Sequence, residues 1–108
     1  MEKTILERIY EMIEDRKVNP KEKSYTNYLL NEGIDKVCKK VGEEAAEVII
    51  AAKNQEDDEF IGEICDLTYH VLVLMFEKNI SVSQVEELLT KRHQIGGNKK
   101  KQNIRGEY

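Results

Sequence analysis

The sequence predicts an all-α protein, a bundle of four to five helices built around an antiparallel central hairpin of residues 34–54 and 57–78. Apolar residues recur at three- and four-residue spacing along most of the chain, which is the pattern of helices with one buried face. The alternation typical of strands is nearly absent, and the 108 residues include one proline. This length fits one domain, which we expect to cover residues 1–97, with 98–108 as a basic, flexible tail.

Two helices are expected in the first third of the chain. Residues 2–16 place their apolar side chains on one helical face: Ile5, Ile9, Met12 and Ile13. Pro20 ends this segment, because the residue before a proline disfavours helix. Ser24 then caps a short helix that runs through Leu30, and Gly33 stops it.

The hairpin follows, and its first helix carries a regular packing seam. The apolar positions alternate in steps of four and three, the spacing of residues that pack against a neighbouring helix: Ile34, Cys38, Val41, Ala45, Val48 and Ala52. Residues 54–57 form a polar turn, and the acidic residues 57–59 suit the positive N-terminal end of the second helix. Because residues 67–76 are apolar on nearly all sides, we expect this helix to be the most buried of the domain.

A last helix is expected to begin at Ser81. Gln84 stands three residues later and completes a capping-box pattern. The inner face of this helix is formed by three apolar residues: Val85, Leu88 and Leu89. Gly96 and Gly97 are expected to end it.

Composition and charge limit the class of function. The net charge of −4 disfavours a nucleic-acid groove, so no nucleic-acid partner is expected. The apolar run at 71–76 is far shorter than the roughly 20 residues that cross a bilayer, and no long apolar run resembling a signal peptide opens the chain. Cys38 and Cys65 fall within helical apolar patterns and are interpreted as reduced core thiols. We therefore expect a soluble, cytoplasmic protein with no membrane partner.

Two pairs of acidic residues give the strongest indication of function. Glu44 is paired with Glu47, and Glu63 with Asp66; each pair is spaced three residues apart and so lies on nearly one helical face. A short turn near residue 55 makes the two helices antiparallel neighbours, so the numbers of residues at equal height add to about 110. Glu47 is then level with Glu63, and Glu44 with Asp66. The sequence predicts four carboxylates that converge between two helices.

Four carboxylates at one level repel one another unless cations lie among them or several are protonated. A set of oxygen ligands alone favours Mg²⁺, or Mn²⁺. A ferritin-like di-iron site would need Glu-x-x-His on the helices, but Leu67 and Thr90 stand three residues before His70 and His93. The alternative is that both pairs belong to ordinary solvated helix faces.

The carboxylates and their neighbours also resemble a known family. Glu43-Glu44-x-x-Glu47, followed after fifteen residues by Glu63-x-x-Asp66, resembles the signature of the all-α nucleoside-triphosphate pyrophosphatase (MazG-like) superfamily. More narrowly, residues 39–54 are similar to phosphoribosyl-ATP pyrophosphatases of histidine biosynthesis. The flanking Ser24-Tyr25-Thr26 and the segment 63–75 resemble the same family. The resemblance covers roughly residues 3–97.

The resemblance implies an enzyme that hydrolyses phosphoribosyl-ATP to phosphoribosyl-AMP and pyrophosphate, the second step of histidine biosynthesis, by cleaving between the α and β phosphates. It also implies Mg²⁺ ligation by four residues: Glu44, Glu47, Glu63 and Asp66. Glu43 points about 100° away from Glu44. Glu43 and Glu47 are the candidates for the catalytic base that takes the proton of the attacking water.

Cationic and aromatic residues are the candidates for substrate binding: Lys40, Lys53, Tyr25 and Arg92. Lys40 lies one turn before Glu44, where a simple ion pair with Glu44 is an equal alternative. Tyr25 either stacks on the adenine or only packs, and both interpretations stay open. His70 lies on the same helical stripe as Glu63 and Asp66, here called the acidic stripe, and is expected to be a hydrogen-bonded core histidine.

Assembly and substrate identity are the remaining expectations. The apolar second half of the hairpin, together with the superfamily resemblance, predicts a homodimer or higher homo-oligomer, in which a second subunit helps to complete the pocket. Two other functions stay open: a house-cleaning (d)NTP pyrophosphatase of the same superfamily, and a non-catalytic helical interaction protein without metal dependence. The carboxylate motif alone does not select the nucleotide.

Overall fold

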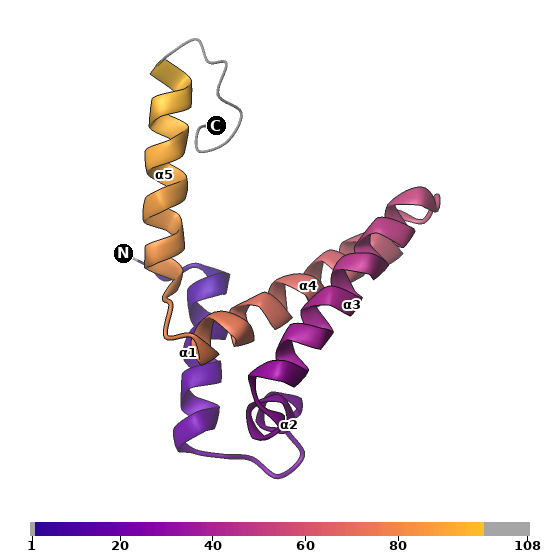
Figure 1. The fold of residues 1–108 in the computed structure, drawn as a ribbon, viewed down its shortest axis with the longest axis vertical. Coiled ribbons are helices and arrows are strands. Elements are labelled where there is room, and N and C mark those ends of the chain that lie inside the picture. Colours follow the sequence, from indigo (N-terminus) through magenta and orange to yellow (C-terminus); the bar gives the residue numbers. More distant parts are fainter. Residues whose placement is uncertain (1, 99–108) are drawn as a thin grey trace.

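The computed structural model describes residues 2–98, with side chains to residue 94, so the predicted tail from residue 99 onward lies outside the described residues. Five helices and no strands make up the described part of the chain, which confirms the predicted all-α class (Figure 1). The helices are α1 (Ile5–Val18), α2 (Tyr25–Glu32), α3 (Ile34–Lys53), α4 (Asp57–Glu77) and α5 (Val82–Asn98). The two long helices α3 and α4 form the expected antiparallel hairpin.

Side-chain caps set where several helices begin. The Ser24 hydroxyl accepts a hydrogen bond from the Asn27 amide at 3.1 Å, as predicted. At the last helix, the amide of Gln84 donates to the Ser81 hydroxyl, and the amide of Ser81 donates to the Gln84 side chain. A capping box at Thr4, which the prediction missed, starts α1 at Ile5.

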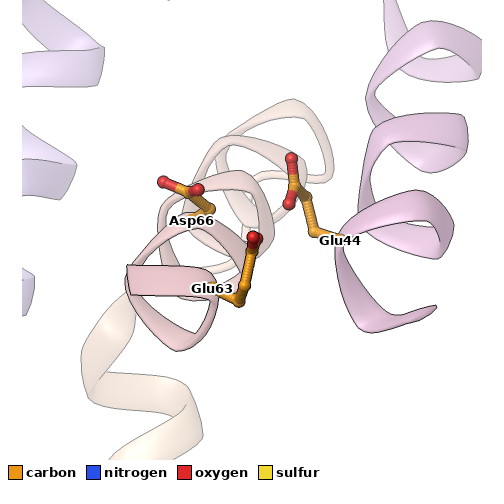
Figure 2. Close-up of side chains that lie close together, drawn as sticks. All are labelled: Glu44, Glu63 and Asp66. Carbon is orange, nitrogen blue, oxygen red and sulfur yellow. The ribbon is translucent and has the colours of Figure 1, made fainter. Parts of the chain in front are cut away.

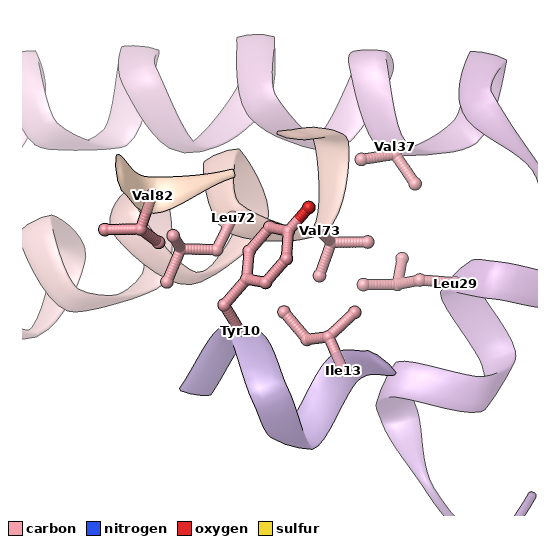
Figure 3. Close-up of a cluster of buried hydrophobic side chains, with 7 residues drawn as sticks. All are labelled: Tyr10, Ile13, Leu29, Val37, Leu72, Val73 and Val82. Atoms are coloured by element: carbon pink, nitrogen blue, oxygen red, sulfur yellow. The ribbon is translucent and has the colours of Figure 1, made fainter. Parts of the chain in front are cut away.

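The hydrophobic core lies where four helices and the start of the fifth meet (Figure 3). It contains seven buried side chains: Tyr10, Ile13, Leu29, Val37, Leu72, Val73 and Val82. The Tyr10 hydroxyl donates a 2.7 Å hydrogen bond to the carbonyl of Ile80, which ties α1 to the connection before α5. Through Val37 and Val73 this core holds one end of the α3–α4 hairpin.

The predicted seam on α3 is wrong by about one residue. The buried residues of α3 are Val37, Glu44 and Ala51. By contrast Ile34 and Ala52, the two ends of the predicted seam, are exposed. The reason is that α3 packs on α4 through the neighbouring stripe, which includes the acidic residue Glu44. Apolar residues of the predicted seam are therefore left partly open to solvent in the single chain.

Two other expectations, the core position of the cysteines and the end of the last helix, need correction. Cys38 and Cys65 are free thiols, as predicted, but both are exposed and neither is a core residue. The apolar run 67–76 is, as predicted, the least exposed part of the hairpin: His70, Leu72 and Val73 are buried and the others are half-buried. The last helix also continues through the glycine pair at 96–97 to Asn98, because glycine weakens a helix without forcing it to end.

The outer face of the hairpin carries exposed isoleucines. Ile49 and Ile50 on α3 are 63% and 62% exposed, and Ile61 on α4 is 56% exposed. Such a concentration of large apolar side chains on one element is typical of a contact surface. None of the helices described between residues 2 and 98 combines the length and apolar character that spanning a membrane requires.

Candidate metal centre

Three of the predicted carboxylates meet between α3 and α4. Figure 2 shows Glu44 on α3 facing Glu63 and Asp66 on α4. One carboxylate oxygen from each residue lies within 4.8 Å of the other two. Glu44 is buried at 7% exposure, Glu63 is half-buried and Asp66 is exposed. The group therefore opens to solvent on its Asp66 side.

The turn between the helices sets the register that brings these residues together. α3 ends at Lys53 and α4 begins at Asp57, so the connection has three residues. Asn54 holds it with two hydrogen bonds: its amide donates to the Ala51 carbonyl at 3.1 Å, and its side chain donates to Glu59 at 2.9 Å. A tight turn of this kind leaves little freedom for the two helices to slide past each other.

Two buried oxygens in the cluster of Glu44, Glu63 and Asp66 lack hydrogen-bond partners within the part of the chain that the structure describes. Among the described residues, Oε2 of Glu44 and Oε1 of Glu63 are buried and have no hydrogen-bond partner. Burial raises the pKa of Glu63, and the negative charges of Glu47, Glu44 and Asp66 raise it further. Unpaired buried carboxylate oxygens are costly unless a cation or a proton satisfies them. The donor set, made of carboxylate oxygens alone, fits a hard divalent cation.

Glu47 and Glu43 lie at the edge of this group. Glu47 is exposed and close enough to Glu63 to raise the pKa of that residue, but it is not part of the three-residue cluster. Glu43 is also exposed and forms an ion pair with Lys40 at 3.4 Å. The spacing allowed an ion pair between Lys40 and Glu44, but in the structure Lys40 pairs with Glu43.

Tyr25 is linked through His70 to the backbone of Asp66, one of the three clustered carboxylate residues. Nδ1 of His70 lies 2.7 Å from the Asp66 carbonyl oxygen, and Nε2 lies 2.8 Å from the Tyr25 hydroxyl. A carbonyl oxygen can only accept, so Nδ1 carries the proton; in the neutral ring Nε2 then accepts from the Tyr25 hydroxyl. His70 is 5% exposed, as expected of a hydrogen-bonded core histidine. The Tyr25–His70 hydrogen bond thus links α2 to the acidic stripe of α4.

A basic pocket adjoins the carboxylates. Only some of its residues were predicted from the sequence. It has a volume of about 290 Å³ and is lined by Tyr25, Tyr28, Lys36, Lys39, Lys40 and Glu43. Tyr25 and Lys40 were predicted as substrate-binding residues; Tyr28, Lys36 and Lys39 were missed. The four-residue spacing of Lys36 and Lys40, which places both on one helix face, was the available signal.

The two other predicted substrate-binding residues lie apart from this pocket. Lys53 is exposed in the last turn of α3, about 9 Å along the helix beyond Glu47. Arg92 is half-buried on α5, which Figure 1 shows projecting away from the α3–α4 hairpin. Within one chain, therefore, Arg92 is not brought to the carboxylates.

Comparisons with known proteins show which family the chain resembles. A family model described as phosphoribosyl-ATP pyrophosphohydrolase matches residues 6–93. The chain is 54% identical over 96 residues to the phosphoribosyl-ATP pyrophosphatase of Clostridium botulinum, and the match covers 89% of this chain and 87% of that protein. It is likewise 54% identical over 98 residues to the phosphoribosyl-ATP pyrophosphatase of Clostridium acetobutylicum, covering 91% and 89%.

A longer relative matches as well. The chain is 58% identical over 96 residues to the histidine biosynthesis bifunctional protein HisIE of Lactococcus lactis. That match covers 89% of this chain but 45% of the relative. The chain therefore spans a little less than half the length of the bifunctional protein and most of the length of the clostridial ones.

Proposed function

The chain belongs to the phosphoribosyl-ATP pyrophosphohydrolase family, and from this premise we propose that it hydrolyses phosphoribosyl-ATP to phosphoribosyl-AMP and pyrophosphate in histidine biosynthesis. The family and the enzyme class that the resemblance predicted, a hydrolase, are confirmed. The structural observation that carries the proposal is the group of Glu44, Glu63 and Asp66, with its unpaired buried oxygens. Unpaired buried carboxylate oxygens are costly in a helical scaffold that binds no cation.

We propose Mg²⁺, or Mn²⁺, as the cofactor. Glu44, Glu63 and Asp66 would hold it, with Glu47 completing the set from the edge. When bound, the ion would neutralise the triphosphate and lower the pKa of a coordinated water. Support comes from the oxygen-only donor set and from the raised pKa of Glu63, since both indicate a site that a divalent cation stabilises.

Three further residues are assigned roles in proton transfer and substrate binding. Glu47 accepts the proton of the attacking water, because it borders the cluster and faces solvent, whereas Glu43 lines the neighbouring basic pocket. Lys40 lies where a phosphate would meet the carboxylates and can exchange Glu43 for a phosphate oxygen. Tyr25, held by His70, forms a wall of the substrate pocket.

We also propose that the protein works as a homo-oligomer in the cytoplasm. The exposed isoleucines on the outer face of the hairpin, Ile49, Ile50 and Ile61, support burial against a second copy. Because one chain leaves Arg92 away from its own carboxylates, a neighbouring subunit could bring its α5 to this site. The two free thiols, Cys38 and Cys65, agree with a reducing compartment.

A panel of nucleotides tests the substrate. Purified protein with Mg²⁺ is assayed on phosphoribosyl-ATP, ATP and the four dNTPs, with release of pyrophosphate as the readout. The proposal predicts a kcat/KM for phosphoribosyl-ATP at least about a hundredfold above the others, since the second phosphoribosyl group adds contacts. Strong turnover of dNTPs without turnover of phosphoribosyl-ATP would instead indicate a house-cleaning enzyme.

A further inference from the structure

We propose that the basic pocket between α2 and α3 is a second anion subsite, which binds a phosphate group of the substrate that the carboxylate-bound metal does not reach. The pocket is the one lined by Tyr25, Tyr28, Lys36, Lys39, Lys40 and Glu43. The inference rests on the proposed function, because it concerns the other end of the same substrate. It adds residues to the site that the motif does not contain.

The charge of the pocket is opposite to that of the carboxylate group beside it. Lys36, Lys39 and Lys40 contribute three positive charges against the single carboxylate of Glu43. Contact with the Tyr28 hydroxyl raises the pKa of Lys36, and the neighbouring Tyr25 hydroxyl raises the pKa of Lys40. Both ammonium groups are therefore charged at neutral pH. A ligand that spans the carboxylate cluster and the basic pocket therefore needs two anionic groups. One would bind the metal ion, and the other would bind the lysines.

The spacing along α3 matches a ligand with separated phosphates. Lys36, Lys40 and Glu44 are spaced by one turn each, so they lie in a row along one helix face. Lys40 is about 6 Å along the axis from Glu44, and Lys36 is about 12 Å from it. A terminal phosphate of the triphosphate would fall near Lys40, whereas the 5′-phosphate of the phosphoribosyl group would reach toward Lys36 and Lys39.

The aromatic wall makes the pocket a defined shape and orients its lysines. The rings of Tyr25 and Tyr28 stack with centroids 5.9 Å apart and an interplanar angle of 24°. Lys36 Nζ lies 5.7 Å from the centroid of the Tyr28 ring, a cation–π distance that limits its range of positions. With a neutral His70 ring the Tyr25 hydroxyl donates to Nε2, which leaves the hydroxyl oxygen able to accept a hydrogen bond. Tyr25 and Tyr28 are 45% and 43% exposed, so their rings can pack against a ribose or a base.

The double variant Lys36→Gln with Lys39→Gln tests the subsite, and Lys17→Gln, an exposed lysine of α1, is the matched control. With saturating Mg²⁺, loss of charge-assisted phosphate contacts should raise KM for phosphoribosyl-ATP by tenfold or more and leave kcat within about twofold. The control should match the wild type. Competition by ribose 5-phosphate and by pyrophosphate then separates the two phosphate sources. Weaker inhibition by ribose 5-phosphate alone assigns the subsite to the phosphoribosyl group, and weaker inhibition by pyrophosphate alone assigns it to the triphosphate.

A measurement without turnover keeps this inference separate from the proposed reaction. Inorganic phosphate is titrated into the Mg²⁺-free protein, and the ring proton signals of Tyr25 and Tyr28 are followed by NMR. The subsite predicts saturable shifts that disappear in the double variant and persist in Lys17→Gln. Absence of these shifts in the wild type, or unchanged KM and inhibition in the double variant, overturns the subsite. Absence of phosphoribosyl-ATP hydrolysis by the wild type, with the shifts intact, overturns the proposed reaction instead.

Discussion

Replacing Glu44 by glutamine keeps the shape of the most buried side chain among the three clustered carboxylates and removes its charge. Glu44 is 7% exposed, and its Oε2 has no hydrogen-bond partner among the described residues. The substitution should therefore have opposite effects on two quantities. The metal-free fold should become more stable, because one of the mutually repelling charges is gone. The stabilisation that Mg²⁺ confers should fall, because a ligand oxygen with full charge is lost.

The size of the first effect follows from the spacing of the carboxylates. Two full charges 4.8 Å apart, the outer limit of the group, repel by about 3.5 kcal/mol at an effective dielectric of 20 and by about 0.9 kcal/mol in water. Because Asp66 is exposed, solvent screens the repulsion on that side of the group, and we expect a gain of about 1–2 kcal/mol. For a domain of this length that corresponds to a melting temperature higher by roughly 4–12 °C.

Thermal unfolding followed by circular dichroism measures both effects. Wild type and Glu44→Gln are melted at pH 7 in EDTA and again with Mg²⁺; Glu87→Gln, an exposed carboxylate of α5, is the control for loss of a charge alone. At a Mg²⁺ concentration of 100 times Kd, the wild type should gain about 2.7 kcal/mol, and the variant much less. If Glu44→Gln melts lower than the wild type in EDTA, or gains as much from Mg²⁺, the carboxylates are not a repelling cation site.

Three further predictions follow from the same geometry. In the metal-free protein the pKa of Glu63 is raised above its usual 4.5, so the stability contributed by its protonated form should be lost as the pH rises through that raised pKa, and Glu63→Gln should flatten this loss in pH-dependent melts. Ile50→Glu with Ile61→Glu places charges on the apolar outer face of the hairpin and should reduce the mass measured by light scattering to that of one chain. Tyr25→Phe leaves the buried Nε2 of His70 without its hydrogen bond and should lower the free energy of unfolding by about 1–3 kcal/mol.

Each of these three predictions has its own contrary outcome. A pH profile of stability that is identical in wild type and Glu63→Gln would mean that Glu63 titrates normally in the fold. Ile5→Glu, on an isoleucine that is 65% exposed on α1, is the control for the hairpin substitutions; loss of assembly there as well would remove the assignment of the interface to the hairpin. A Tyr25→Phe protein as stable as the wild type would show that the bond to His70 contributes nothing net.

The carboxylate site could be predicted from sequence because two periodicities and one turn determine it. Spacing of three residues places Glu63 and Asp66 on one face of a helix, and a three-residue turn aligns them with Glu44. Both are local properties of the chain. The same reasoning placed Glu47 equally within the cluster, whereas the structure places it at the edge beside Glu63.

The parts that sequence reasoning missed depend on contacts between distant segments. Spacing shows that a helix has an apolar stripe but not which neighbour covers it, so the seam on α3 was displaced by one residue relative to the buried Val37 and Ala51. The hydrogen bond between Tyr25 and His70 joins residues 45 positions apart, so no local sequence pattern predicts it. The basic pocket likewise needs α2 to lie against α3, which follows only from the packed core.

The most direct test of the account is the Mg²⁺ dependence of phosphoribosyl-ATP hydrolysis in wild type and Glu44→Gln. Phosphoribosyl-AMP and pyrophosphate are quantified at increasing Mg²⁺, with Glu87→Gln as the control. Equal amounts of the two products are expected, with activity that vanishes in EDTA and a loss of at least about a hundredfold in kcat/KM for Glu44→Gln alone. Hydrolysis that persists in EDTA, or a Glu44→Gln enzyme as active as the wild type, would contradict this expectation.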